Sequence, residues 1–235
     1  MAFPERGIAV FLALGIAAPV PAAAFPERPI RLIVPLAPGG GNDTAARVVG
    51  ARLGEALGQP VVVDNRPGGG SVIASELAAR APPDGHTLYL FSTNVTVAPA
   101  LHRTLPFDTL RDFAPITRLT IAPGSLIVHP SLPVRSVKEL IALAKAKPGQ
   151  ITFGSAGLGS GSHLGGELFN MLAGVRLLHV PYKGSALSTA AVLGGETQLA
   201  FTNPIGALPH VKSGRVKMLA VTTAQRWPLL PDLPT

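Results

Sequence analysis

The sequence predicts an α/β fold with mostly parallel strands, and three observations lead to that class. Short apolar runs rich in β-branched residues alternate with longer segments of helical spacing, a pattern typical of parallel strands covered on both faces. The 26 glycines and 24 prolines follow no fixed period, which indicates many short connections and no collagen-like repeat. With 47% hydrophobic and 14% charged residues, the chain can bury a large core and is not expected to be disordered.

The first part of the chain contains three expected strands with two expected helices between them. Prolines between residues 105 and 123 interrupt this rhythm, which predicts a crossing into a second lobe. The strands are expected at residues 30–36, 61–63 and 87–91, and the helices at residues 44–57 and 71–81.

The second part resumes the alternation after that crossing. Ser136 and Glu139 form a capping box that opens a helix, and Pro148 and Gly149 end it. A last strand at residues 217–221 is expected to return to the first lobe. The predicted lobes are therefore residues 25–104 with 217–235, and residues 105–216. Other strands are expected at residues 126–128, 151–153, 177–180 and 198–201, and helices at residues 164–172 and 187–193.

The first 24 residues have the parts of a secretory signal. Arg6 precedes an apolar run over residues 7–20, and three alanines end at Ala24. A membrane-spanning helix would have to continue through Pro19 and Pro21, which disfavours an anchor. We expect cleavage after Ala24 and export to the periplasm.

Composition excludes several classes of function. The net charge of +7 comes from basic residues that are scattered singly and lack aromatic platforms, so a nucleic-acid interface is not predicted. The absence of cysteine excludes disulfides and thiol catalysis. The histidines lack zinc-ligand spacing, and no serine has the spacing of a hydrolase nucleophile. No metal, cofactor or enzymatic activity is predicted.

Two glycine-rich turns lie where an expected strand ends and a helix begins, at residues 38–43 and 155–163. Glycine lets a ligand approach the backbone, and the first amides of the following helix have no partner inside the helix. Such a turn accepts a carboxylate or a phosphate. The simpler alternative is a tight connection in which Asp43 or Ser160 caps the helix.

Several motifs spread over the mature chain resemble those of the Bug-type receptors. These receptors are the substrate-binding proteins of tripartite tricarboxylate transporters. The motifs lie at residues 38–43 (PGGGND), 61–68 (VVVDNRPG), 81–88 (APPDGHTL), 128–133 (VHPSLP), 162–164 (SHL), 179–184 (HVPYKG) and 229–235 (LLPDLPT).

This resemblance implies a two-lobed periplasmic-binding-protein (Venus-flytrap) architecture with the ligand in a cleft between the lobes. It also implies a small carboxylate ligand, held by backbone amides and waters, and inner-membrane permease subunits as partners. The implied ligand-binding residues are Gly39, Gly40, Asn42, Asp43 and Thr44 in the first turn, Ser155, Ala156, Gly157, Gly159, Ser162 and His163 in the second, and Ser92, Thr93, Asn94, Tyr182, Lys183, Thr202 and Asn203 elsewhere.

Some of these residues have simpler explanations. Asp43 can support its turn without touching a ligand, and His163 can pack at a helix end. Tyr182 and Lys183 can form a strand-exit turn with a solvated lysine. The family often has aspartate at the position of Thr202, which leaves the ligand specificity open.

Members of that family continue beyond the position of Thr235, so the first lobe is expected to be incomplete. Three functions stay open: a receptor that delivers a carboxylate to a permease, a truncated receptor that no longer binds, and an exported enzyme on the same scaffold. No recurring spacing of nucleophile, base and orienting group favours the enzyme.

Overall fold

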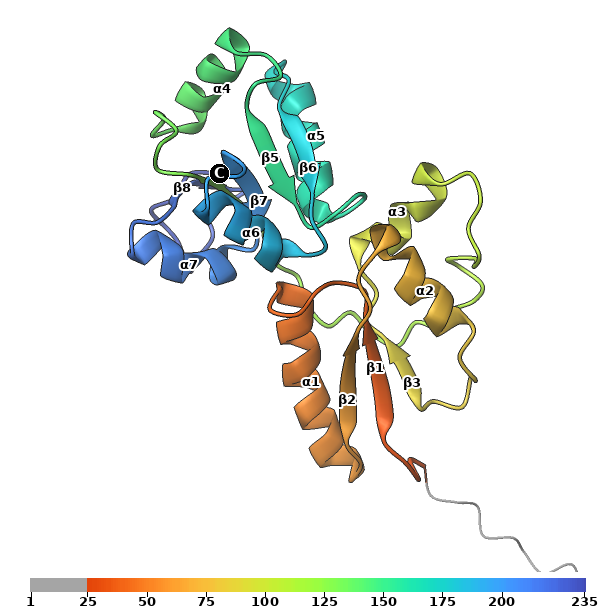
Figure 1. Cartoon of the computed structure of the whole chain (residues 1–235). Helices are drawn as coiled ribbons and strands as arrows, with labels where there is room; N and C mark the ends of the chain where they lie inside the picture. The colour runs from red at the N-terminus through yellow and green to blue at the C-terminus, as the bar shows by residue number, and fades with distance from the viewer. Residues whose placement is uncertain (1–24) are drawn as a thin grey trace, which may run out of the picture.

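The computed structural model describes residues 25–235, which form two lobes joined by residues 102–124 (Figure 1). The expected signal peptide and its cleavage after Ala24 lie outside the described residues. Within the described part, every helix is too short or too polar to cross a bilayer.

The first lobe is built on a three-stranded parallel sheet in the order β2-β1-β3. Leu32 and Val34 of the central strand pack with Ala46 and Leu90 to form its core. The elements of this lobe are β1 (Ile30–Val34), α1 (Gly41–Leu57), β2 (Val61–Asn65), the short 3-10 turn η1 (Gly69–Ser71), α2 (Val72–Ala79), β3 (Thr87–Tyr89) and α3 (Thr93–Leu101).

Helix α1 lies close against strand β2 because two of its residues have no side chain. A Cβ atom on Gly50 would lie 3.3 Å from Cγ1 of Val61, and one on Gly54 would lie 3.1 Å from the carbonyl oxygen of Gln59. Larger residues would push the helix away from the sheet. Figure 1 shows α1 running alongside β2.

The second lobe is built on a five-stranded mixed sheet in the order β6-β5-β7-β4-β8. β5 pairs in parallel with β6 and β7, whereas β4 runs antiparallel to both β7 and β8. Its elements are β4 (Ser125–Val128), α4 (Val137–Ala146), β5 (Thr152–Ser155), α5 (Gly161–Ala173), β6 (Leu178–Pro181), α6 (Ser185–Leu193), β7 (Leu199–Thr202), α7 (Pro204–Lys212) and β8 (Lys217–Val221).

The expected return of residues 217–235 to the first lobe is wrong, because β8 is an edge strand of the second sheet. Leu219 packs into the core on one face of that sheet and Met218 into the core on the other. The residues after β8 stay there too: the Val221 amide donates to the Pro234 carbonyl at 2.9 Å, and Leu233 packs on the same core as Met218.

The lobe boundary also differs from the expected one at residues 104 and 105. The ring of Phe113 lies 5.6 Å from the ring of Tyr89 and 5.4 Å from that of Phe91, and the buried Phe107 packs against Phe113. Aromatic burial therefore keeps the chain on the first lobe until about residue 113.

The capping box begins helix α4 with a small difference from the usual pattern. Ser136 Oγ accepts from the Glu139 amide at 3.2 Å, and Glu139 Oε2 accepts from the Arg135 amide at 2.7 Å, one residue before the cap. Helices α3 and α7 were not predicted, and each contains an internal proline, Pro99 and Pro209.

Candidate functional site

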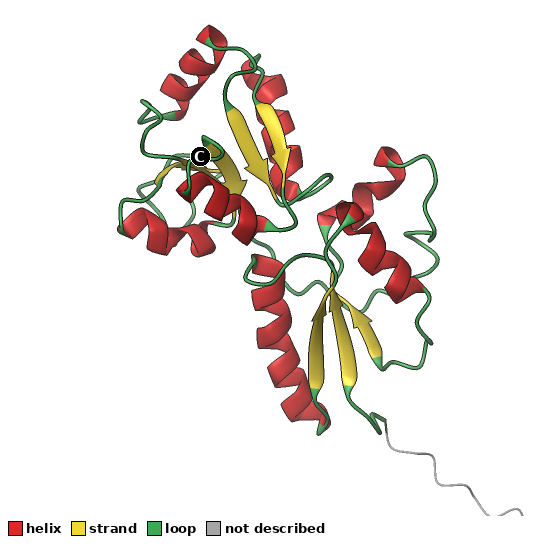
Figure 2. Cartoon of the chain, in the orientation of Figure 1, coloured by secondary structure: helices red, strands yellow, loops and turns green. Residues whose placement is uncertain are grey.

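The parallel strands of the two sheets have their carboxyl ends toward each other. In Figure 1 the arrows of β1 and β2 point toward the second lobe, and those of β5 and β6 point toward the first. In Figure 2 the arrowheads of these same strands point to the region between the lobes, and loops leave the strands there. Ligands of open α/β sheets collect at this end of the strands.

The lobes touch directly in this region. The Ala37 amide of the first lobe donates to the Lys183 carbonyl of the second at 2.8 Å. The side-chain amide of Asn94 donates to the Leu158 carbonyl at 2.7 Å. These two hydrogen bonds fix the distance between the turn regions of the two lobes.

A cleft of about 180 Å³ lies between the lobes beside these contacts. Lys183 is the one residue with an ionisable side chain among those that line it, and no acidic residue lines it. Of the residues implied by the resemblance, four line it: Asn94, Ala156, Gly157 and Lys183. The other lining residues are Pro35, Leu36, Gly68, Gly69, Gly70, Ser71, Leu158 and Pro181.

The first glycine-rich turn packs against the second lobe instead of lining the cleft. A Cβ atom on Gly40 would lie 2.9 Å from Oγ of Ser185, and one on Gly41 would lie 3.2 Å from Nδ2 of Asn203. Thr44 is exposed, and its hydroxyl donates to the Gly40 carbonyl at 3.1 Å. Asn42 is half-buried in the first turn of α1.

Asp43 holds that turn in shape. Its Oδ2 accepts from the Gly39 amide and from Arg47 Nε, both at 3.0 Å. Burial raises the pKa of the Asp43 carboxyl, but hydrogen bonds from Arg47, Gly39 and Asn65 outweigh burial and keep the pKa below its ordinary value. The contacts of Asp43 are therefore those of a residue that supports the turn.

The second turn satisfies several of its amides with its own side chains. The Ala156 amide donates to Ser162 Oγ at 2.9 Å, the Gly157 amide to Ser155 Oγ at 3.1 Å, and the Gly159 amide to His163 Nδ1 at 3.2 Å. A ligand carboxylate would have to share or replace these acceptors.

The rings of Phe153, His179 and His163 pack together beside the second turn. His179 lies between Phe153 and His163, with ring centroids 4.9 and 4.2 Å away, and its Nε2 is 2.6 Å from Oγ of Ser155. Burial and then the charge of His163 lower the pKa of His179 to about 4, so its ring is neutral at pH 7. Ser155 is fully buried and accepts from the Gly157 amide, so it acts as a support of the turn.

The remaining implied residues are not among those that line the cleft. The Tyr182 hydroxyl donates to Glu196 Oε2 at 3.3 Å, and Thr202 Oγ1 is 3.1 Å from Thr189 Oγ1. Asn203 caps α7 by accepting from the Ile205 amide. Ser92 and Thr93 begin α3; the Ser92 hydroxyl donates to Asn94 Oδ1 at 3.3 Å.

Sequence reasoning missed a third glycine-rich turn that does line the cleft. Residues 68–71 (GGGS) join β2 to α2 in the same strand–turn–helix pattern as the two predicted turns. That pattern was the available signal, and the motif at residues 61–68 ends inside the turn.

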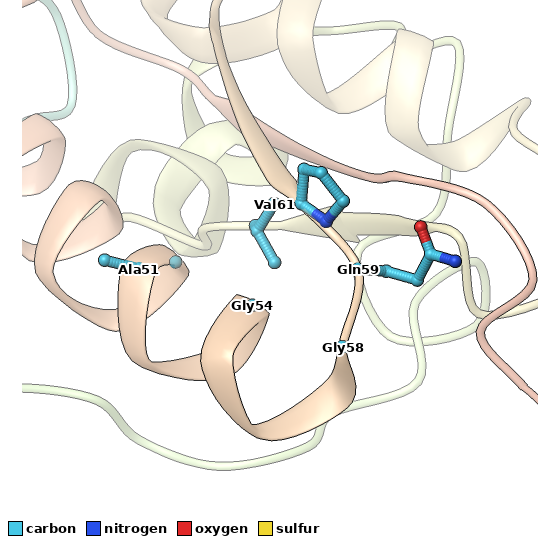
Figure 3. A pocket seen from close by; sticks show the side chains of 7 residues that line it. Ala51, Gly54, Gly58, Gln59 and Val61 are labelled. Atoms are coloured by element: carbon cyan, nitrogen blue, oxygen red, sulfur yellow. The ribbon is translucent and has the colours of Figure 1, made fainter.

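A second, shallower groove of about 430 Å³ lies outside the interlobe region, along α1 (Figure 3). Gly50, Gly54, Gly58, Gln59 and Val61 are among its lining residues, and none of the lining side chains is ionisable. The groove lies by the amino end of β2, opposite to the end at which ligands of α/β sheets collect.

Two α/β lobes with a cleft between their strand ends define the class of periplasmic binding proteins, and solved structures support this class. A Rhodopseudomonas palustris protein solved with adipate is 40% identical, with a TM-score of 0.86 over 90% of this chain and 71% of that one. MatC of the same organism, solved with bound malate, is 31% identical, with a TM-score of 0.82 over 90% of this chain and 72% of that one.

The chain belongs to the tripartite tricarboxylate transporter receptor family, which it matches over residues 45–235. BugT of Bordetella pertussis is 40% identical over 231 residues, which make up 97% of this chain and 71% of BugT. The chain spans 63% of the length of another relative, from Pseudomonas sp. strain P51, to which it is 39% identical.

Proposed function

We propose that this protein is an extracytoplasmic solute receptor that binds a small carboxylate between its lobes. We further propose that it delivers the ligand to the inner-membrane permease subunits of a tripartite tricarboxylate transporter. The observation that carries the proposal is the interlobe cleft, which has Lys183 in its lining and glycine-rich turns from both lobes at its walls.

The electrostatics of the cleft suit an anion. The lining contains no acidic side chain, and the turns from residue 68 and from residue 156 lead into the amino ends of α2 and α5, which carry partial positive charge. The net charge of +7 adds a long-range attraction for anions.

Binding is tested by thermal unfolding with a panel of mono-, di- and tricarboxylates, neutral sugars and amino acids. A carboxylate present at 100 times its dissociation constant should stabilise the chain by about 2.7 kcal/mol. The neutral sugars are the control and should leave the midpoint unchanged. Stabilisation by sugars and by none of the carboxylates would contradict the proposal.

Export is part of the proposal. Residues 1–24 act as a signal peptide that is removed after Ala24. Mass spectrometry of the protein from the periplasmic fraction should find Phe25 as the first residue. Recovery of the intact amino terminus from the membrane fraction would contradict this part.

A further inference from the structure

The net charge of the chain is concentrated in the second lobe. Residues 25–113 contain as many basic residues (Lys or Arg) as acidic ones, eight of each, whereas residues 114–235 contain eleven basic and only four acidic residues. The salt bridges follow the same division, since every one found among residues 25–235 lies in the first lobe. The second lobe therefore carries the whole net charge of +7.

Three of these basic residues lie at one end of the second lobe. Lys145 and Lys147 are at the carboxyl end of α4, Arg176 follows α5, and all three are exposed. The two loops lie side by side: the Gly149 amide donates to the Arg176 carbonyl at 2.7 Å, and a Cβ atom on Gly149 would lie 3.2 Å from Arg176 Nε. Strands β5 and β6 begin directly after these loops and end beside the cleft, so this end of the lobe is opposite to the cleft (Figure 1).

Exposed apolar side chains lie at the same end. Met171 and Leu172, in the last turn of α5, are 70% and 76% exposed, and Leu178, the first residue of β6, is 54% exposed. Helix α5 leaves its large side chains outside because it packs on the sheet through glycine: a Cβ atom on Gly166 would overlap the ring of Phe153. Exposed apolar side chains that gather in one place mark an interaction site, whereas single ones do not.

Acidic residues do not offset the basic residues at this end. Glu167 is the one acidic residue between residues 140 and 195, and it lies in the middle of α5. The exposed residues at this end of the lobe are called the basic pole below. They are Lys145, Lys147, Met171, Leu172, Arg176 and Leu178.

We propose that the basic pole binds the surface of an anionic phospholipid membrane. The cations attract lipid phosphates, and the three apolar side chains enter the boundary between head groups and acyl chains. Lysine is depleted at protein–protein interfaces, so the two lysines of the pole favour lipid over an acidic protein surface. Because the pole is opposite to the cleft, a receptor held in this way keeps its cleft open to solutes. This inference goes beyond the proposed function and does not depend on the ligand.

The test measures binding of the purified chain to lipid vesicles by sedimentation. The chain begins at Phe25 and contains both lobes, because the apolar run at residues 7–20 would itself bind lipid. Vesicles of phosphatidylcholine alone are compared with vesicles of phosphatidylcholine and phosphatidylglycerol in equal parts. Each cation near an anionic surface strengthens binding about fivefold, so the three cations should make binding to the anionic vesicles roughly 100-fold tighter.

A first pair of variants locates the charged part of the surface. The double variant Lys147→Gln/Arg176→Gln should weaken binding to the anionic vesicles roughly 30-fold, because two cations are lost. The matched control is Lys212→Gln/Arg215→Gln, which removes the same charge from exposed residues at and after the end of α7. The control should weaken binding less than about fivefold, because salt screens charges that lie away from the lipid.

A second pair tests the apolar part. Leu172→Ser should weaken binding about tenfold, because a leucine side chain no longer enters the lipid. Ile205→Ser is the control: Ile205 is 58% exposed on α7 and should not touch the membrane, so binding should stay unchanged. Thermal unfolding verifies that each variant is folded.

Each outcome decides the inference. Equal binding to both kinds of vesicle, or binding to neither, would overturn it. Equal losses in the two charge variants would mean that the overall charge attracts the lipid, which also overturns the assignment to the pole. Full binding by Leu172→Ser would show that the cations act alone. Binding only to membranes that contain the permease subunits, and to no pure lipid vesicle, would assign the pole to a protein partner. None of these results bears on carboxylate binding, so the proposed function is judged separately.

Discussion

Replacing Gly159 by alanine should weaken ligand binding by obstructing the approach of the two lobes. Gly159 lies in the second turn and has a φ of 74°. An added Cβ atom would lie 2.8 Å from Val97 Cγ2 and 3.0 Å from Leu101 Cδ1, both on α3 of the first lobe. Carbon atoms normally approach to about 3.5–4.0 Å. Both side chains must therefore move before the lobes can meet.

The magnitude follows from these contacts. Displacing a side chain from its rotamer costs about 0.5–1.5 kcal/mol, so moving both costs about 1–3 kcal/mol, or roughly 5- to 150-fold in affinity. The positive φ adds about 1–2 kcal/mol for alanine, but that strain is present whether the lobes are together or apart. It therefore lowers the stability of the fold and leaves the affinity unchanged.

Gly174→Ala is a matched control. Gly174 ends α5 with a φ of 61°, and a Cβ atom there would meet nothing within 4 Å. Titration calorimetry with a carboxylate that stabilises the chain, together with thermal unfolding, separates the two effects. Both variants should unfold at a lower temperature than the unsubstituted chain, but only Gly159→Ala should bind the carboxylate more weakly. Equal affinities of the two variants would refute the reasoning that the lobes close through this contact.

Three further predictions test other parts of the structure. Gly157→Val should impair binding more than Lys183→Ala does, because the added Cβ atom at residue 157 would lie 3.0 Å from the Tyr182 carbonyl oxygen and the φ of that residue is 116°. If calorimetry gave the reverse order, the lysine would be the group that captures the anion. The pKa of His179 is about 4 in the folded chain, and its ordinary value is 6.5. Between these pH values the unfolded chain binds more protons, so the stability of the fold should fall as the pH falls through this range. Thermal unfolding of a His179→Gln variant that kept the same dependence on pH would contradict this. Val62 lies on the edge strand β2 and is 54% exposed. The chain should therefore associate as its concentration rises, and Val62→Lys should reduce this association. Light scattering that found a monomer at all concentrations would contradict the prediction.

The order of the strands and of most helices could be predicted because these elements carry a local signal. The runs at residues 30–36 and 126–128 are mostly apolar and rich in β-branched residues, and strands form within or around them, at Ile30–Val34 and Ser125–Val128. The partner of a strand is a non-local property, and nothing in residues 217–221 distinguishes the two sheets. Their assignment to the first lobe was wrong because the two-sided burial of Met218 and Leu219 appears only after β4 is in place.

Helices α3 and α7 were missed for a different reason. Pro99 is the seventh of nine residues in α3, and Pro209 is the sixth of nine in α7. A proline disfavours the interior of a helix by about 3 kcal/mol, and helices this short depend on packing more than on propensity. The buried Val95 and Ala207 supply that packing, which sequence propensities do not report.

The candidate site was predicted in kind more than in detail. Glycine-rich turns at helix amino ends do form the walls of the cleft, but the first turn packs against α6 and the third lines the cleft in its place. Which turn is open depends on the angle between two lobes, and no local pattern encodes that angle. The sequence likewise could not show that side chains of the second turn accept hydrogen bonds from its own amides, because those contacts depend on the folded shape of the turn. The acceptors are Ser155, Ser162 and His163.

The connection between the lobes, at about residues 114–124, has a mechanical consequence. It is the only passage of the chain between the lobes within residues 25–235. The Ala37–Lys183 and Asn94–Leu158 hydrogen bonds join the two lobes independently of this connection. These two hydrogen bonds therefore constrain the relative orientation of the lobes in addition to the connection, and a substitution that removed either would change the shape of the cleft.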